Sequence, residues 1–187
     1  MAVTPSSMLP LGTIAPDFTL FDTLSETNIS LQNYHSDTAT VIMFICNHCP
    51  FVKHIAQQLV KLTQDYQPKG IQFIAISSND AKNYPADSPD KMSEMAKQLK
   101  FTFPYCYDET QAVAKAYHAA CTPDFYIFDK NFACVYRGQF DDSRPGNAIP
   151  VTGKDIRAAL DALLLGNDVS PDQKPGIGCN IKWLSAF

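Results

Sequence analysis

Two cysteines separated by two residues are the part of the sequence best suited to chemistry. They are Cys46 and Cys49, in the run Cys46-Asn47-His48-Cys49. A thiolate can attack a disulfide sulfur, and a second cysteine can then attack the mixed disulfide and release the substrate thiol. Cys49 lies one helical turn after Cys46 and is close enough for that second step. The spacing therefore predicts thiol–disulfide exchange, with Cys46 as the attacking thiol and Cys49 as the resolving thiol.

The segments on either side of the pair predict how it is held. The run at 40–45, TVIMFI, is β-branched and apolar on both faces, which is typical of a central strand covered on each side. After Pro50, apolar residues recur every three to four positions, which predicts a helix with Pro50 in its first turn. Unpaired N–H groups and the helix dipole favour an anion there, so we expect an exposed Cys46 with a lowered pKa. A protonated His48 would lower that pKa further, which makes it a candidate tuning residue.

A zinc site is the main alternative for such a pair. Zinc in structural sites takes four ligands, and the sequence has no second C-x-x-C and no His pair at zinc-binding spacing. We therefore expect no metal and no cofactor.

The rest of the chain alternates strands with helices. A second buried strand is predicted at 71–77, a helix begins at Ser88-Pro89, and a short strand follows at 103–106. Asp108 is expected to cap a helix, segments 125–128 and 133–136 to form a hairpin, and Thr152-x-x-Asp155 to begin a final helix. This order predicts an α/β fold of three layers. Residues 1–187 are expected to form one domain, with an irregular tail at 166–187.

Composition restricts the partners and the compartment. The chain has 187 residues and a formal net charge of −4, so it offers no basic surface for nucleic acid. No apolar run approaches the roughly 20 residues that cross a membrane, and no secretion signal is recognisable. Six cysteines are too few for a disulfide scaffold in a chain of this length. We expect a soluble, cytoplasmic protein.

Three segments together resemble the thioredoxin superfamily, in its redoxin or peroxiredoxin-like group. They are CNHCP after an apolar strand, TPDFYIFD about 70 residues later, and the opening LGTIAPDFTLFD. The resemblance covers nearly the whole chain. It implies a thioredoxin-like fold with a central mixed sheet flanked by helices and an N-terminal extension. It also implies a cis bond between Thr122 and Pro123, packed against the cysteines, beside backbone that pairs with substrate.

The sequence departs from the better-known relatives. Thioredoxin has W-C-G-P-C and a buried Asp on the preceding strand, where this chain has I-C-N-H-C and Thr40. Peroxiredoxins have T-x-x-C, with the peroxidatic cysteine at the place of Cys49, but Cys46 stands at the Thr and no activating arginine is evident near Ala120-Cys121. A thiol peroxidase with antioxidant activity, using Cys49, is therefore the second hypothesis. A third is copper handling by the pair with His118.

Further cysteines leave several roles open. Cys121 stands two residues before Pro123, and the tail around Cys179 carries Ile181 and Trp183, so it is expected to fold back onto the domain. Either cysteine could relay the disulfide, or both could be small buried apolar residues. Cys106 and Cys134 have no assigned role. The expected partner is a disulfide-containing protein or a small thiol; its identity, the reductant, the redox direction and the oligomeric state stay open.

Overall fold

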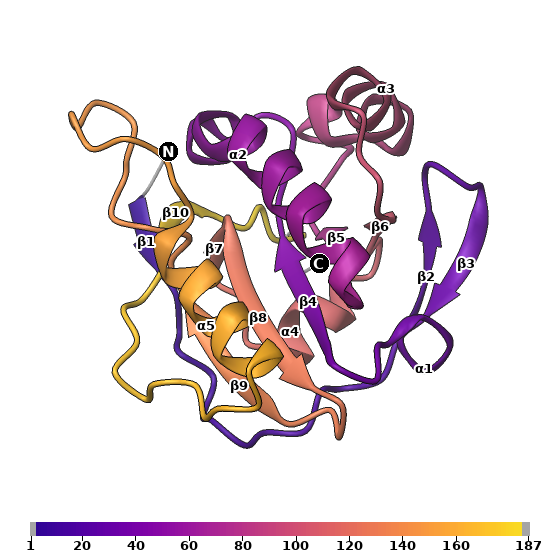
Figure 1. Ribbon diagram of the computed structural model, residues 1–187. Helices are drawn as coiled ribbons and strands as arrows, with labels where there is room; N and C mark the ends of the chain where they lie inside the picture. Colours follow the sequence, from indigo (N-terminus) through magenta and orange to yellow (C-terminus); the bar gives the residue numbers. More distant parts are fainter. Residues whose placement is uncertain (1–2, 185–187) are drawn as a thin grey trace.

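A seven-stranded mixed sheet forms the centre of the computed structural model, which describes residues 3–184 (Figure 1). The strand order is β3-β2-β6-β5-β4-β8-β9, and β4 runs parallel to β5 but antiparallel to β8. The parallel pair and the antiparallel β8–β9 hairpin at the edge are both as predicted. The strands are β2 (Thr19–Asp22), β3 (Thr27–Ser30), β4 (Ala39–Phe44), β5 (Ile71–Ser77), β6 (Tyr105–Tyr107), β8 (Asp124–Asp129) and β9 (Cys134–Gly138).

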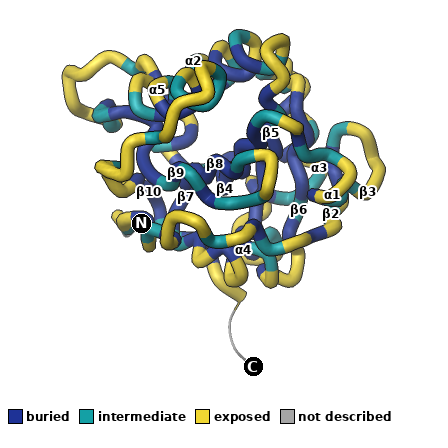
Figure 2. The backbone as a smooth tube through the Cα atoms, turned by 60° about the horizontal axis from the view of Figure 1, so that its bottom comes forward, coloured by how far each residue is buried: buried dark blue, intermediate teal, exposed yellow. Residues whose placement is uncertain are grey.

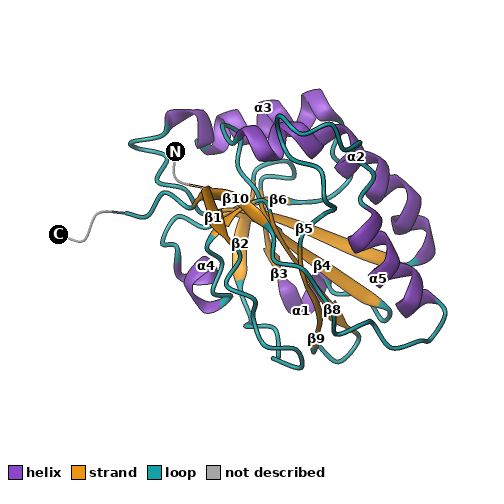
Figure 3. Cartoon of the chain, turned by 90° about the vertical axis from the view of Figure 1, so that its left-hand side faces the viewer, coloured by secondary structure: helices purple, strands orange, loops and turns teal. Residues whose placement is uncertain are grey.

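Helices cover both faces of this sheet, which confirms the three-layer α/β prediction (Figure 3). One face packs against α2 (Pro50–Tyr66), α3 (Pro89–Leu99) and α5 (Lys154–Leu164), and the other against α1 (Leu31–Tyr34) and α4 (Ala112–Ala116). Two 3-10 turns are also present, η1 (Gln67–Lys69) and η2 (Pro85–Asp87). None of the helices within residues 3–184 is long and apolar enough to cross a membrane.

Strand β4 lies at the middle of the fold, and all six of its residues are buried (Figure 2). Successive side chains of a strand point to opposite faces. Val41 and Met43 accordingly join the core beneath α2, whereas Ile42 and Phe44 join the core on the other face. The continuous apolar run is explained by this two-sided burial, and β4 fixes the start of the cysteine loop.

A second, small sheet was not expected from the sequence. It has the order β1-β10-β7, all antiparallel, with β1 (Val3–Pro5), β10 (Ile177–Asn180) and β7 (Cys121–Thr122). The tail has no helix or strand at 167–176, as predicted, but at Ile177–Asn180 the prediction of an irregular tail is wrong. Four residues that include Gly178 give no strand pattern on their own, because their partners lie far away in the sequence. Residues 185–187 of the predicted tail lie outside the described residues.

Two helix starts differ from the prediction. Helix α5 follows Gly153, whose φ of 68° is left-handed, so the expected capping box at Thr152 is wrong. The carboxylate of Asp141 accepts the N–H groups of Thr152 and Gly153 instead. The N-cap residue of helix α4 is Gln111. Asp108 lies three residues before it, and its carboxylate accepts the backbone N–H of Ala114 at 2.9 Å.

Candidate active site

The cysteine pair lies between the end of β4 and the start of α2, as predicted. Cys46 is the second residue after β4, and Cys49 is the N-cap residue of α2 in an extended conformation. Pro50 is the first helical residue, where its missing N–H costs nothing and its fixed φ suits the helix. The sulfur of Cys49 therefore stands at the positive end of the helix dipole.

Thr122 touches both sulfurs. The Thr122-Pro123 bond is cis, which confirms that prediction. The Oγ1 of Thr122 lies 3.4 Å from the sulfur of Cys46, and its carbonyl oxygen lies 3.1 Å from the sulfur of Cys49. The segment implied by the resemblance is thus brought against the pair, with Thr122 making these contacts.

Neither sulfur is open to solvent. Cys46 is 1% exposed and Cys49 0% exposed, so the expectation of an exposed first sulfur is wrong. Thr122 covers one side of the pair. Cys179, on β10, lies with its sulfur 3.0 Å from that of Cys49. A substrate can reach the pair only if part of this cover moves.

The surroundings favour a thiolate at Cys49 and a thiol at Cys46. The hydrogen bond with Cys46 lowers the pKa of Cys49 to about 5; Cys179 and the amide of Val52 also favour the thiolate, against the opposing effect of burial. Pairing with Cys49 raises the pKa of Cys46, and burial and the charge of Asp87 raise it further. The expected lowering of the pKa at Cys46 is therefore wrong. The helix start acts on Cys49, while a carboxylate faces Cys46.

That carboxylate was missed by sequence reasoning. Asp87, the last residue of η2, is fully buried, and its Oδ1 accepts the backbone N–H groups of Asn47 at 2.8 Å and His48 at 3.1 Å. Its Oδ2 accepts from the side chain of Asn79 at 2.8 Å. The available signal was the polar stretch that follows β5, because loops after neighbouring parallel strands meet at one edge of a sheet.

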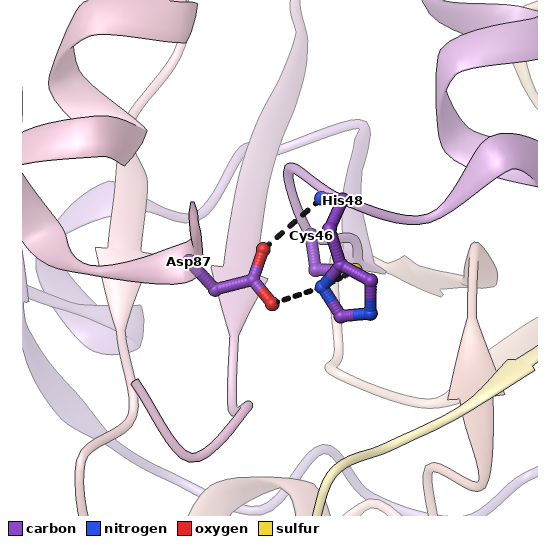
Figure 4. A group of neighbouring side chains, drawn as sticks. All are labelled: Cys46, His48 and Asp87. Carbon is purple, nitrogen blue, oxygen red and sulfur yellow. Dashed lines mark hydrogen bonds and ion pairs between the residues drawn. The ribbon is translucent and has the colours of Figure 1, made fainter. Parts of the chain in front are cut away.

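The ring of His48 points toward Asp87 and lies closer to it than to Cys46 (Figure 4). Its Nδ1 lies 2.5 Å from the Asp87 carboxylate and 3.9 Å from the Cys46 sulfur. The side chains of His48 and Asp87 therefore form a short hydrogen bond. The ring stacks on Tyr84, with centroids 5.5 Å apart. The tuning role of His48 stays a prediction.

A group that could hold a metal coincides with this network. Candidate ligand atoms of Cys46, His48 and Asp87 lie within 4.8 Å of one another. In this arrangement Nδ1 of His48 is hydrogen-bonded to Asp87, and Asp87 already accepts several N–H groups. His118, the histidine of the copper hypothesis, is exposed after the end of α4 and is not in the group.

The remaining cysteines separate into one that touches the pair and three that do not. Cys179 contacts Cys49, whereas the sulfur of Cys121 has its hydrogen bond with the carbonyl of Pro123 at 3.8 Å. Since Thr122 faces the pair, strand alternation points Cys121 to the opposite face. Cys106 and Cys134 belong to the core on the other side of the main sheet, and burial raises the pKa of each.

The arginines of the chain are bonded away from the pair. Arg137 donates to the carbonyl of Leu9 and to Gln173. Arg144 donates to carbonyl groups of its own loop, and Arg157 pairs with Asp65. Among the hydrogen bonds and ion pairs of residues 3–184, no guanidinium reaches a cysteine sulfur.

Comparison with known proteins adds a family and a fold. The model of the AhpC/TSA family matches residues 11–137. No curated protein matches the chain. An uncharacterized conserved protein from Geobacillus kaustophilus is 60% identical, with 100% of this chain and 99% of that one covered and a TM-score of 0.98.

Two further solved structures are similar. A hypothetical protein from Sinorhizobium meliloti 1021 is 46% identical, with 98% of this chain and 100% of that one covered and a TM-score of 0.95. The thioredoxin domain of a thiol-disulfide oxidoreductase from Bacteroides vulgatus is 17% identical, with 69% and 88% covered and a TM-score of 0.59. The last likeness supports the thioredoxin-like fold.

Proposed function

The chain belongs to the AhpC/TSA family, and on this premise we propose that it is an oxidoreductase that exchanges disulfides through Cys49 and Cys46. The observation that carries the proposal is the central position of the Cys49 sulfur. It stands at the start of α2, in contact with Thr122 and beside Cys46; pairing of the two sulfurs lowers the pKa of Cys49 and raises the pKa of Cys46. A stabilised thiolate beside a second thiol is what exchange requires.

Cys49 is the nucleophile in this proposal, which reverses the order expected from the sequence. Its thiolate attacks one sulfur of the substrate disulfide, forming a mixed disulfide and releasing one substrate thiolate. Cys46 passes its proton to a leaving thiolate and attacks the Cys49 sulfur, which releases the second substrate thiolate. The substrate disulfide is reduced to one thiol and one thiolate, which takes a proton from water, and Cys46 and Cys49 are oxidised to a disulfide. The reverse sequence of steps oxidises a substrate dithiol.

The proposed substrate site is the edge beside Thr122 and Pro123. The Oγ1 and carbonyl groups of Thr122 already contact both sulfurs, so a substrate strand that took the place of β10 on this edge would bring its disulfide to Cys49. A disulfide-containing protein or a small thiol remains the proposed partner. A cytoplasmic location is also proposed, because reduced thiols suit a reducing compartment.

A thiol peroxidase using Cys49 is the second candidate. It is favoured by the lowered pKa of Cys49, since the thiolate is the reacting form in thiol chemistry. It is disfavoured by the arginines, which are bonded elsewhere. Disulfide exchange needs no guanidinium and is therefore the preferred proposal.

The test is a paired assay of disulfide reduction and peroxide consumption. We expect the wild type to reduce a protein disulfide faster than it consumes hydrogen peroxide, and Cys49→Ser to lose disulfide reduction. Cys134→Ser, at a buried cysteine on β9, is the matched control and should behave as the wild type. Fast peroxide consumption with no disulfide reduction would replace this proposal by the peroxidase.

A further inference from the structure

The C-terminal strand lies on the edge where a substrate is proposed to pair. β10 lies beside β7 (Figure 1) and is antiparallel to it. The register places Cys179 opposite Thr122 and Asn180 opposite Cys121. The other edge of β10 is taken by β1. The chain therefore occupies its own β7 edge with a strand that carries a cysteine.

Cys179 reaches the centre of the site. Its sulfur lies 3.0 Å from that of Cys49, and it is only 2% exposed. Cys49 is thus in contact with two thiols, Cys46 from its own loop and Cys179 from the strand above it. A disulfide bond is about 2.05 Å long, so a small movement brings Cys49 and Cys179 to bonding distance.

The backbone around Cys179 is built for this close approach. A Cβ added at Gly178 would lie 2.0 Å from the carbonyl oxygen of Thr122, so only glycine allows β10 to come this near. Just before the strand, the carbonyl of Gly176 accepts the backbone N–H of Ser6 at 2.8 Å. Just after the strand, Lys182 donates its backbone N–H to the side-chain oxygen of Asn79 at 2.8 Å.

These anchors connect the strand to the cysteine loop. Asn79, which accepts from Lys182, also donates to Asp87, and Asp87 holds the backbone of Asn47. The Lys182 carbonyl accepts further hydrogen bonds from Asp80 and Gln111. Cys179 is therefore held over Cys49 from both ends of β10, and its position does not depend on the sulfur contact alone.

We propose that Cys179 is a second resolving cysteine, which closes a disulfide with Cys49 in competition with Cys46. The inference rests on the proposed exchange chemistry at Cys49 and adds a redox role for the terminal strand. In this arrangement β10 acts as a tethered strand on the substrate edge, and a Cys49–Cys179 disulfide would fix it there.

The reaction balances with a disulfide as the oxidant. With oxidised glutathione, the Cys49 thiolate forms a Cys49–glutathione disulfide and releases one glutathione thiolate. Cys179 gives its proton to a leaving thiolate and attacks the Cys49 sulfur, which releases the second glutathione thiol. The protein is oxidised to a Cys49–Cys179 disulfide and glutathione is reduced. If a Cys46–Cys49 disulfide is already present, the same attack frees the Cys46 thiol without net oxidation.

The direct test uses Cys46→Ser in the full chain, treated with oxidised glutathione and mapped by mass spectrometry. We expect a Cys49–Cys179 linkage and release of both glutathione thiols. Cys121→Ser in the same background is the matched control, because Cys121 faces away from the pair, and it should give the same linkage. A stable glutathione adduct on Cys49 of Cys46→Ser would overturn the proposal.

A backbone substitution gives a second test that keeps every sulfur of the first variant. Gly178→Ala, added to Cys46→Ser, must push β10 away from Thr122. We expect closure of the Cys49–Cys179 disulfide to slow about 100-fold, the loss that a misplacement of ~1 Å can cause. Gly176→Ala is the control, because its Cβ would meet the nearest atom at 3.4 Å. Equal closure rates in the two variants would count against the proposal.

The outcomes separate this inference from the proposed function. Disulfide reduction by the wild type, together with a trapped adduct in Cys46→Ser, would keep the function and remove the role of Cys179. Failure of the wild type to react with any disulfide, with no Cys49–Cys179 linkage in Cys46→Ser, would remove both.

Discussion

Cys46 and Cys49 share one motif but have different neighbours. Cys49 stands at the start of α2 with the amide of Val52 near its sulfur, whereas the carboxylate of Asp87 faces Cys46. Nearby hydrogen-bond donors favour a charged thiolate, and a nearby negative charge disfavours it. In the proposed reaction, these contacts set the order in which the two thiols react.

The titration of Cys49 is the first prediction. The ultraviolet absorbance of its thiolate should rise with a midpoint near its pKa of about 5. Cys46→Ala should move this midpoint upward, because the largest favourable contact with the thiolate is removed. Cys49→Ser identifies the signal, which should then be absent in this pH range. A midpoint that Cys46→Ala leaves unchanged would show that Cys46 does not stabilise the thiolate.

At the scale of elements, the structure agrees with the sequence where the signal is local. The run that became β4 has two apolar faces, and the spacing after Pro50 gives α2, so the position of the pair follows from adjacent residues. β10 could not be predicted in this way. It has four residues, and its pairing depends on β1 and β7, which are distant in the sequence.

The same distinction applies to the site. The pair and the Thr122-Pro123 segment were predicted from their motifs, and Cys179 was named as a candidate relay, but the role of Asp87 and the strand pairing that brings Cys179 to Cys49 were not predicted. Asp87 reaches the cysteine loop only because the segments after β4 and β5 meet in the fold. Whether a polar residue of a loop turns inward depends on the backbone N–H groups it finds there, and those belong to another loop.

The packing of α2 gives the second prediction. Leu59 is 1% exposed and joins the core beneath this helix. Leu59→Ala should lower the free energy of unfolding by roughly 2–5 kcal/mol, the usual cost of such a cavity. Lys61→Ala, at an exposed position of the same helix, should change it by less than about 0.5 kcal/mol. Urea unfolding compares the two, and equal effects would contradict the assigned core.

At the scale of the whole molecule, segments from both ends of the described chain meet beside the pair. β1 and β10 complete the small sheet over β7, and Thr122 leads directly into β8 through Pro123. β8 begins with Asp124, which is 0% exposed and accepts from the hydroxyl of Tyr126 at 2.9 Å. The junction of the two sheets therefore contains a buried carboxyl group.

Asp124 gives the third prediction. Burial raises its pKa from 3.8 to about 7. A carboxyl whose pKa is higher in the folded state stabilises the fold at low pH and loses that contribution as pH rises from near 4 through 7. Asp124→Asn should not lose this stability. Above pH 7 its free energy of unfolding should exceed that of the wild type by roughly a few kcal/mol. The measurement is the free energy of unfolding of both proteins, from denaturant unfolding across this pH range. If the two free energies change with pH in the same way, Asp124 is not the source of the lost stability.

The site of the first mixed disulfide tests whether Cys49 is the nucleophile. Cys46→Ser/Cys179→Ser leaves Cys49 without its two neighbouring thiols, and Cys49→Ser leaves Cys46 without its partner. Each is treated with oxidised glutathione under native conditions and mapped by mass spectrometry. We expect a glutathione adduct on Cys49 in the first variant and no adduct on Cys46 in the second. An adduct on Cys46, with Cys49 unmodified, would contradict it.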